Sequence, residues 1–113
     1  MIKDKKILII GASSASGRSI SPILCQDNEV YFCDMVDSYN IDIANKWFKD
    51  SSFENISVIV SQINPDMIFN FAGTFTNDYE IDYKANVLVP KLILDAVSEM
   101  QNETRVLLVG SAA

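Results

Sequence analysis

The chain has 113 residues, 49% of them hydrophobic and 21% charged, which indicates one globular domain with a single core and not a disordered chain. Nine basic against fifteen acidic residues give a net charge of −6, so we expect no nucleic-acid partner. No histidine is present, which excludes the common zinc sites and every histidine-based nucleophile pair. Cys25 and Cys33 lie among apolar neighbours, so we expect two small buried side chains, no disulfide framework and no metal site.

The first ten residues resemble a signal peptide only superficially. Their unbroken apolar run is limited to residues 7–10, and Asp4 interrupts the basic stretch before it. No stretch of the chain is long and apolar enough to span a membrane. We therefore expect a cytoplasmic protein with no membrane partner.

Strands and helices alternate along the chain. Continuously apolar or β-rich runs predict strands at residues 6–10, 29–33, 41–43, 66–72 and 105–109. Apolar residues at three- and four-residue steps predict helices at residues 20–26, 52–63 and from 79 or 82 to 100. This alternation implies right-handed crossovers and a parallel sheet with helices on both faces. We expect a three-layer, Rossmann-like α/β domain with about five parallel strands in the order 3-2-1-4-5.

A glycine-rich loop separates the first predicted strand from the first predicted helix. Gly11 permits a tight turn, small residues at 12–16 let a pyrophosphate approach the backbone, and Gly17 lets the helix pack close to the sheet. The unpaired N–H groups and the positive dipole end of the helix then face the anion. This placement predicts a dinucleotide site that includes Gly11, Ser13, Ser14, Ala15, Ser16 and Gly17.

Asp34 supplies the second half of this signature. It ends the second strand about 20 residues after Gly11, where a carboxylate can accept hydrogen bonds from the adenosine ribose and repel a 2′-phosphate. We therefore expect NAD as the cofactor, with NADP less suited. The alternative for the loop taken alone is an ordinary strand-to-helix turn, and a nucleoside-triphosphate P-loop is excluded because no Gly-Lys-Ser/Thr follows.

Further short motifs follow in a fixed order. Asp42-Ile43 comes first, then a run at residues 65–73 that ends in Ala-Gly, then Asn86-Val-Leu-Val-Pro, and finally a run at residues 106–111 that ends in Ser111. With the loop and Asp34, these motifs resemble the extended short-chain dehydrogenase/reductase family, the NAD-dependent epimerases, dehydratases and reductases of nucleotide sugars. The middle glycine of the family loop is Ser14 here.

The resemblance implies roles for particular residues. The position of Ser111 corresponds to the family's catalytic hydroxyl at the end of the fifth strand. Further cofactor contacts are implied in the adenine pocket, at the end of the fourth strand and on the helix that follows it, at Asp42, Ile43, Phe71, Ala72, Gly73 and Asn86.

The family's general acid/base is a Tyr followed four residues later by a Lys, beyond the fifth strand. None of the four tyrosines has a Lys at that spacing. We therefore expect residues 1–113 to form an incomplete NAD(P)-binding Rossmann domain that binds NAD without turnover. Hydride transfer at a sugar carbon, and a nucleotide-sugar substrate, would belong only to an intact enzyme.

Two other functions stay open: a non-catalytic NAD(P)-sensing or protein-interaction module, and a methyltransferase-like domain. A methyltransferase also uses a glycine-rich loop and an acid after the second strand, but it leaves Ser111 and Asn86 without a role. Apolar residues on the helix at residues 82–100 further predict self-association into a homo-oligomer.

Overall fold

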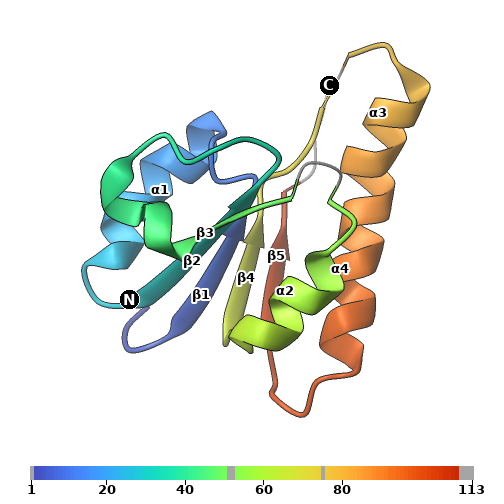
Figure 1. The fold of residues 1–113 in the computed structure, drawn as a ribbon. Coiled ribbons are helices and arrows are strands. Elements are labelled where there is room, and N and C mark those ends of the chain that lie inside the picture. The colour runs from blue at the N-terminus through green and yellow to red at the C-terminus, as the bar shows by residue number, and fades with distance from the viewer. Residues whose placement is uncertain (1, 51–52, 75, 110–113) are drawn as a thin grey trace.

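The computed structural model describes residues 2–50, 53–74 and 76–109, and they form a Rossmann-like α/β fold around one five-stranded parallel sheet. The strand order β3-β2-β1-β4-β5 confirms the prediction. Helices α2 and α4 cover one side of the sheet and α1 covers the other (Figure 1), which makes three layers. The strands are β1 (Lys6–Ile10), β2 (Glu29–Asp34), β3 (Trp47–Lys49), β4 (Met67–Asn70) and β5 (Arg105–Leu108). The helices are α1 (Ala15–Cys25), α2 (Ile56–Ile63), α3 (Tyr79–Tyr83) and α4 (Val89–Ser98), with the 3₁₀ helix η1 (Ile41–Lys46) and the π-helical turn η2 (Lys84–Leu88).

The central strand β1 is buried on both faces. Its four residues from Ile7 to Ile10 expose 0% of their surface. The strand pairs in parallel with β2 on one side and with β4 on the other. A strand in this position must be apolar at consecutive residues, because helices cover both faces of a parallel sheet. This requirement explains why an apolar run without alternation predicts the strand at residues 6–10.

Alternate residues of the strands build two apolar layers. Ile9 and Phe32 pack on the α1 side of the sheet together with Leu24. Leu8 packs on the opposite side, where Ile59 of α2 and Ile93 of α4 meet it in the larger cluster. Full burial of side chains of this size stabilises the fold by about 1.5–3 kcal/mol each.

The structure corrects the prediction of a strand at residues 41–43. These residues begin the 3₁₀ helix η1, because the side chain of Asn40 accepts a hydrogen bond from the Asp42 N–H at 2.9 Å and caps the turn. The edge strand β3 lies at Trp47–Lys49 instead, paired with β2. The Trp47 ring stacks on Phe32 with ring centroids 6.0 Å apart.

Helical structure runs from α3 through η2 into α4, as the sequence predicts for this region, and ends at Ser98. Within it, the N–H of Val89 donates to the carbonyl of Lys84, one residue beyond the usual α-helical partner. Pro90 follows at the start of α4 and has no N–H to donate. The long helix therefore tolerates Pro90 beside a π-helical turn, a feature that is often associated with functional sites.

The two cysteines occupy different environments. Cys33 of β2 is buried, and this burial, followed by the nearby Asp50 and Asp34 carboxylates, raises the pKa of its thiol to about 12. Cys25 is exposed, so the expectation that it is buried is wrong. Cys25 is the last residue of α1, where Ser21 and Leu24 take the positions that face the core.

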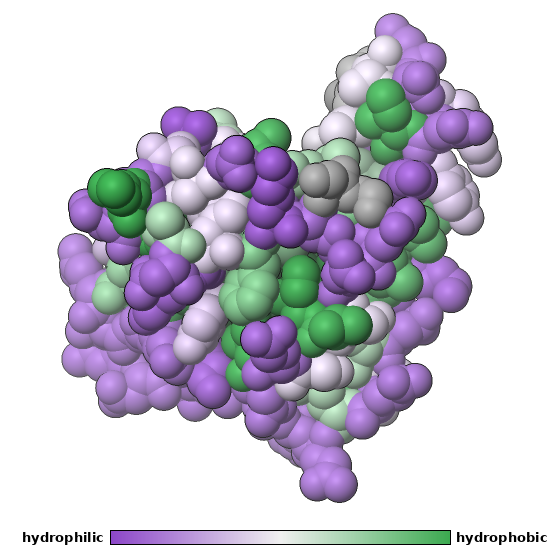
Figure 2. Space-filling view, in the orientation of Figure 1, coloured by the Kyte–Doolittle hydropathy of each residue, from purple (hydrophilic) through white to green (hydrophobic). Residues whose placement is uncertain are grey.

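No helix in the described ranges has the length and apolar character needed to cross a membrane. On the face drawn in Figure 2, hydrophilic side chains predominate, and apolar side chains gather near its middle. Apolar side chains are exposed on β5, at Leu107 and Leu108, and along the long helix, at Tyr83, Val87 and Leu94. The side chains of residues 7–10 on β1 are thus fully buried, whereas most of those on β5 are exposed.

Candidate functional site

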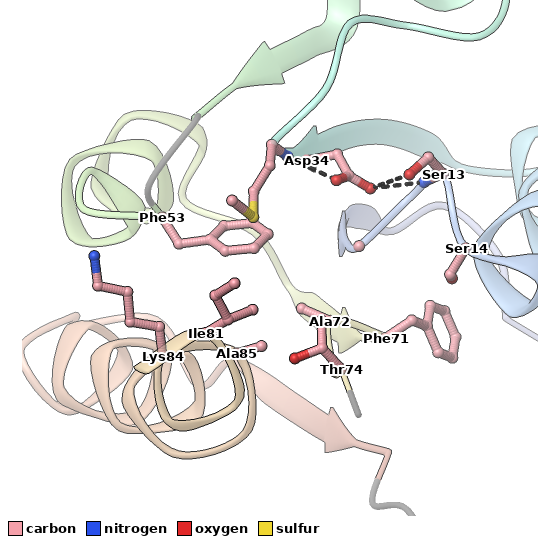
Figure 3. A pocket seen from close by; sticks show the side chains of 13 residues that line it. Ser13, Ser14, Asp34, Phe53, Phe71, Ala72, Thr74, Ile81, Lys84 and Ala85 are labelled. Atoms are coloured by element: carbon pink, nitrogen blue, oxygen red, sulfur yellow. Dashed lines mark hydrogen bonds between the residues drawn. The ribbon is translucent and has the colours of Figure 1, made fainter. Parts of the chain in front are cut away.

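A cavity of about 330 Å³ opens at the carboxyl ends of the central strands. Side chains from the loop after β1, the end of β2, the end of β4 and the long helix surround it (Figure 3). In the sheet, β1 lies between β2, which is the next strand along the chain, and β4. Ligands of open α/β sheets bind at such a switch point. The lining residues are Gly11, Ser13, Ser14, Asp34, Met35, Phe53, Phe71, Ala72, Gly73, Thr74, Ile81, Lys84 and Ala85.

Gly11 makes the floor of the cavity possible. Its φ of +76° lies in the left-handed region, and a Cβ at this position would approach the Ala72 nitrogen to 2.5 Å. The Gly11 N–H donates to the Cys33 carbonyl at 2.9 Å, and the Phe71 N–H donates to the Ile10 carbonyl at 2.8 Å. The backbones that leave β1 and β4 therefore pass too close together for any side chain at residue 11.

The start of α1 presents amide groups beside this floor. Ser14 is the N-cap, and its hydroxyl accepts a hydrogen bond from the Gly17 N–H at 3.0 Å. Among the described residues, the N–H groups of Ala15 and Ser16 have no acceptor. A Cβ on Gly17 would lie 2.7 Å from the Ala12 carbonyl oxygen, so this glycine lets the helix approach the loop. The helix N-terminus thus offers two unpaired donors to an anion.

The Asp34 carboxylate lies across the same loop. One of its oxygens, Oδ2, accepts hydrogen bonds from the Ser13 N–H at 2.9 Å and from the Ser13 hydroxyl at 2.6 Å. Its other oxygen, Oδ1, accepts from the Met35 N–H at 2.6 Å, and the residue is 8% exposed. A carboxylate has about four lone-pair directions, so Asp34 keeps acceptor capacity at the cavity.

Asp42 and Ile43 do not line the cavity. Asp42 is exposed on η1, and Ile43 packs against the apolar layer on the α1 side of the sheet. The acid that follows β3 is Asp50, which is 3% exposed and whose carboxylate accepts a hydrogen bond from the Asn55 N–H at 2.7 Å. The adenine-pocket interpretation of Asp42 and Ile43 rests on a resemblance to a short family motif, and the edge strand expected at residues 41–43 lies six residues further along the chain, at β3.

The segment that follows β3 contributes the side chain of Phe53 to the cavity. It is 5% exposed, and its φ of 55° is unusual for a bulky residue. The Phe53 N–H donates to the Asp50 carbonyl at 3.1 Å. The Phe53 ring points toward the cavity (Figure 3). No glycine or charge pattern marks Phe53 in the sequence, which is why sequence reasoning missed it.

The opposite wall comes from the end of β4 and the long helix. Phe71, Ala72 and Gly73, for which the family resemblance implies cofactor contacts, all line the cavity. The Asn86 side chain accepts from the Thr74 N–H at 3.0 Å and donates to the Thr74 carbonyl at 2.8 Å, so it pins the loop after β4 and does not line the cavity itself. Asn70 does not line the cavity, and its side chain accepts a hydrogen bond from the Ala72 N–H, two residues along the chain, at 3.1 Å.

Asp82 holds the same loop from the first turn of the long helix. Its carboxylate accepts hydrogen bonds from the Thr74 hydroxyl at 2.7 Å, and from the Thr76 N–H and hydroxyl, each at 3.0 Å. These bonds, led by the one from Thr74, lower the pKa of the Asp82 carboxyl. The helix therefore fixes the loop through two side chains, Asp82 and Asn86.

Of the other predicted site residues, Ala15, Ser16 and Gly17 form the start of α1 and do not line the cavity. Ser111 lies outside the described residues. Sequence reasoning missed six residues that line the cavity, because side chains of their kinds are common in any core or surface: Met35, Phe53, Thr74, Ile81, Lys84 and Ala85.

No family model matches this chain, and no curated protein matches it significantly. Solved structures do match. The enzyme WbmG of Bordetella bronchiseptica, determined in complex with NAD, has a TM-score of 0.80 at 19% identity over 97% of this chain and 38% of its own. Uronate dehydrogenase of Agrobacterium tumefaciens has a TM-score of 0.79 at 16% identity over 97% of this chain and 42% of its own.

A third similar structure is UDP-N-acetylglucosamine 4-epimerase of Methanobrevibacter ruminantium, in complex with UDP-N-acetylmuramic acid. Its TM-score is 0.74 at 17% identity, over 92% of this chain and 37% of its own. These likenesses establish the fold. The chain spans about 40% of the length of the uronate dehydrogenase structures that it matches.

Proposed function

We propose that this chain binds a nicotinamide dinucleotide in the cavity at the carboxyl ends of β1, β2 and β4. The observation that carries the proposal is that two unpaired amide donors, Ala15 and Ser16, begin α1 directly after the loop whose Ser13 holds the Asp34 carboxylate at the end of β2. A dinucleotide needs both groups, because its pyrophosphate is anionic and its adenosine ribose offers hydroxyl donors. The complex of WbmG with NAD supports the choice of ligand.

In this proposal each part of the cavity holds one part of the ligand. The pyrophosphate lies over Gly11 and the start of α1, and the adenosine ribose donates to Asp34. The adenine ring lies against Met35 and Phe53, in the apolar part of the cavity. Asp34 favours NAD over NADP, because a carboxylate repels the extra phosphate at the 2′-position.

We further propose that residues 1–113 are the cofactor-binding portion of an oxidoreductase of the extended short-chain dehydrogenase/reductase type. The bound nicotinamide would supply the hydride chemistry, while this chain's residues bind and orient the cofactor. Ser111 would stand at the position of a catalytic hydroxyl. Two of the similar structures, a uronate dehydrogenase and a UDP-N-acetylglucosamine 4-epimerase, support a sugar as the substrate class.

The experiment is calorimetric titration of the folded chain with NAD and with S-adenosylmethionine. We expect NAD to bind and S-adenosylmethionine not to bind. Binding of S-adenosylmethionine alone would favour the methyltransferase-like alternative, and no binding of either ligand to folded protein would remove the cofactor assignment. A sensing module would also bind NAD, so only turnover of a sugar substrate in the intact protein separates it from an enzyme.

The matched variants are Asp34→Asn and Asp37→Asn. Asp37 is an exposed acid three residues away, in a surface ion pair with Lys49 at 3.4 Å. Loss of a hydrogen bond to a charged group costs about 1.5–3 kcal/mol, so Asp34→Asn should weaken NAD binding about 10- to 100-fold. Asp37→Asn removes the same charge and should change the NAD affinity less than about twofold. Equal losses in the two variants would count against the ribose contact.

Self-association through the long helix stays a prediction. Tyr79, Tyr83, Val87 and Leu94 expose apolar surface along it. Sedimentation equilibrium of the chain tests whether a second copy covers this surface. A monomer at every concentration measured would remove the prediction.

A further inference from the structure

Arg18, in the first turn of α1, reaches back over the glycine-rich loop. Its Nε donates to the Ser13 carbonyl at 2.9 Å, and its guanidinium carbon lies 4.4 Å from the centre of the Tyr39 ring. Tyr39 belongs to the loop that follows β2. Arg18 therefore bridges the two loops that follow β1 and β2, between which an adenosine ribose would lie.

Ser13 connects Arg18 with Asp34. Its N–H and hydroxyl donate to the Asp34 carboxylate, and its carbonyl accepts from Arg18. The guanidinium and the carboxylate are thus held by one residue, but they form no ion pair with each other in the described ranges. Within those ranges, the two terminal amino groups of Arg18 also make no hydrogen bond. The Arg18 guanidinium, which has unused donors, is thus linked through Ser13 to Asp34, the acid that would bind the ribose.

These groups match the two forms that an adenosine ribose can take. A free 2′-hydroxyl is a donor and suits Asp34. A 2′-phosphate carries negative charge and several acceptor oxygens, which the planar, permanently charged guanidinium can bind at two points. The Tyr39 ring holds the guanidinium by a cation–π contact and the Ser13 carbonyl orients it, so less side-chain entropy is lost on binding.

We infer that Arg18 is a second determinant of cofactor specificity: it binds the 2′-phosphate of NADP, so that the chain accepts NADP nearly as well as NAD. The inference rests on the proposed dinucleotide site and deepens it. Asp34 alone predicts a strong preference for NAD, because its charge repels the phosphate. Arg18 offsets that repulsion from the other side of Ser13, and the remaining preference is small.

The test compares NAD with NADP, and AMP with adenosine 2′,5′-bisphosphate, by calorimetric titration. The second pair isolates the adenosine end of the ligand. We expect the wild-type chain to bind NADP within about tenfold of NAD, since a charge-assisted bond offsets a like-charge repulsion of similar size. Arg18→Gln should weaken NADP and the bisphosphate about tenfold or more, while NAD and AMP change less than about twofold.

Arg105→Gln is the matched control. Arg105 is the chain's other arginine, exposed at the start of β5, whereas the cavity lies at the opposite ends of the strands. It removes the same charge, so a loss of NADP affinity in Arg18→Gln alone is a local effect. Tyr39→Leu should weaken NADP less than Arg18→Gln does, because the guanidinium stays while its ring support is lost.

Three results would overturn the inference. One is a wild-type preference for NAD of more than about tenfold over NADP. Another is an equal loss of NAD and NADP affinity in Arg18→Gln, and the last is an equal loss of NADP affinity in Arg105→Gln. In each of these results NAD still binds, so the proposed function survives. Absence of all nucleotide binding to folded protein, checked by circular dichroism, would overturn the proposed function itself.

Discussion

The two walls of the cavity are built by different physical means. The wall formed by the glycine-rich loop depends on backbone packing, because Gly11 lies where a Cβ would meet the Ala72 nitrogen at 2.5 Å. The wall formed by the loop after β4 depends on side-chain hydrogen bonds, from Asn86 and Asp82 to Thr74 and Thr76. A steric constraint is broken by added side-chain volume, whereas hydrogen bonds to a carboxylate are broken when the carboxylate is protonated. The two walls should therefore fail under different perturbations.

The largest expected effect is that of Gly11→Ala on the first wall. The added methyl group meets backbone atoms of β4, and the φ of +76° disfavours any L side chain, so unfolding should become easier by about 2–4 kcal/mol. Urea denaturation followed by circular dichroism measures the loss.

The control for this variant is Gly73→Ala, on the second wall. A Cβ at residue 73 would lie 3.2 Å from the Asn86 Oδ1, which belongs to a side chain that can shift. The expected cost is below about 1 kcal/mol. Similar costs for the two alanine variants would show that the first wall is not sterically constrained as described.

An intermediate effect is expected from Asn86→Ala, which removes both hydrogen bonds to Thr74. Two backbone bonds near the surface are worth about 1–2 kcal/mol together, and the loop after β4 loses its anchor. Denaturation gives the stability change, and titration with NAD should show weaker binding as well.

Asn102→Ala is matched to this variant. The Asn102 amide donates to the Pro65 carbonyl at 3.2 Å, at the opposite end of β4 from the cavity. It should lower stability without changing the NAD affinity. If NAD binds equally well to Asn86→Ala, the second wall does not shape the site.

The smallest effect is local and depends on pH. Hydrogen bonds from Thr74 and Thr76 lower the pKa of the Asp82 carboxyl, so these bonds are complete above the ordinary Asp pKa of about 3.9. They are lost as the pH falls through the lowered value, below that point. The Thr76 amide resonance should therefore shift only in the acid range, and Asp82→Asn should abolish the transition.

Asp66 provides an internal reference for that titration. A hydrogen bond from the Lys6 N–H lowers the pKa of its carboxyl, at the other end of the sheet. The Lys6 amide should titrate in the acid range in both wild type and Asp82→Asn. A Thr76 transition that persists in Asp82→Asn would mean that another group holds the loop.

Much of the first wall could be predicted from the sequence, because its signals are local. The apolar run of β1, the glycine at residue 11 and the acid at residue 34 each act within a few residues of their own position. The structure places Gly11, Ser13, Ser14 and Asp34 on the cavity. Steric requirements of this kind leave a visible mark, since only glycine satisfies them.

The side of the cavity that Met35 and Phe53 line could not be predicted in the same way. A three-residue edge strand carries almost no pattern, and Ile41-Asp-Ile resembles a strand as well as Trp47–Lys49 does. The Asn40 cap and the stacking of Trp47 on Phe32 decide between them. The edge strand is therefore expected six residues too early, and Phe53, which follows β3, carries no pattern that marks it as a cavity residue.

The sequence by itself determined the alternation of strands and helices, the strand order and the loop between β1 and α1, since continuous burial and backbone conformation restrict residue type. Only the tertiary structure decided which side chains meet: Phe53 with the end of β4 across the cavity, Asn86 and Asp82 with the loop they hold, and Arg18 with Ser13 and Tyr39. Those contacts join residues far apart in the chain or depend on loop conformations, and ordinary polar and aromatic side chains carry no local mark of their partners.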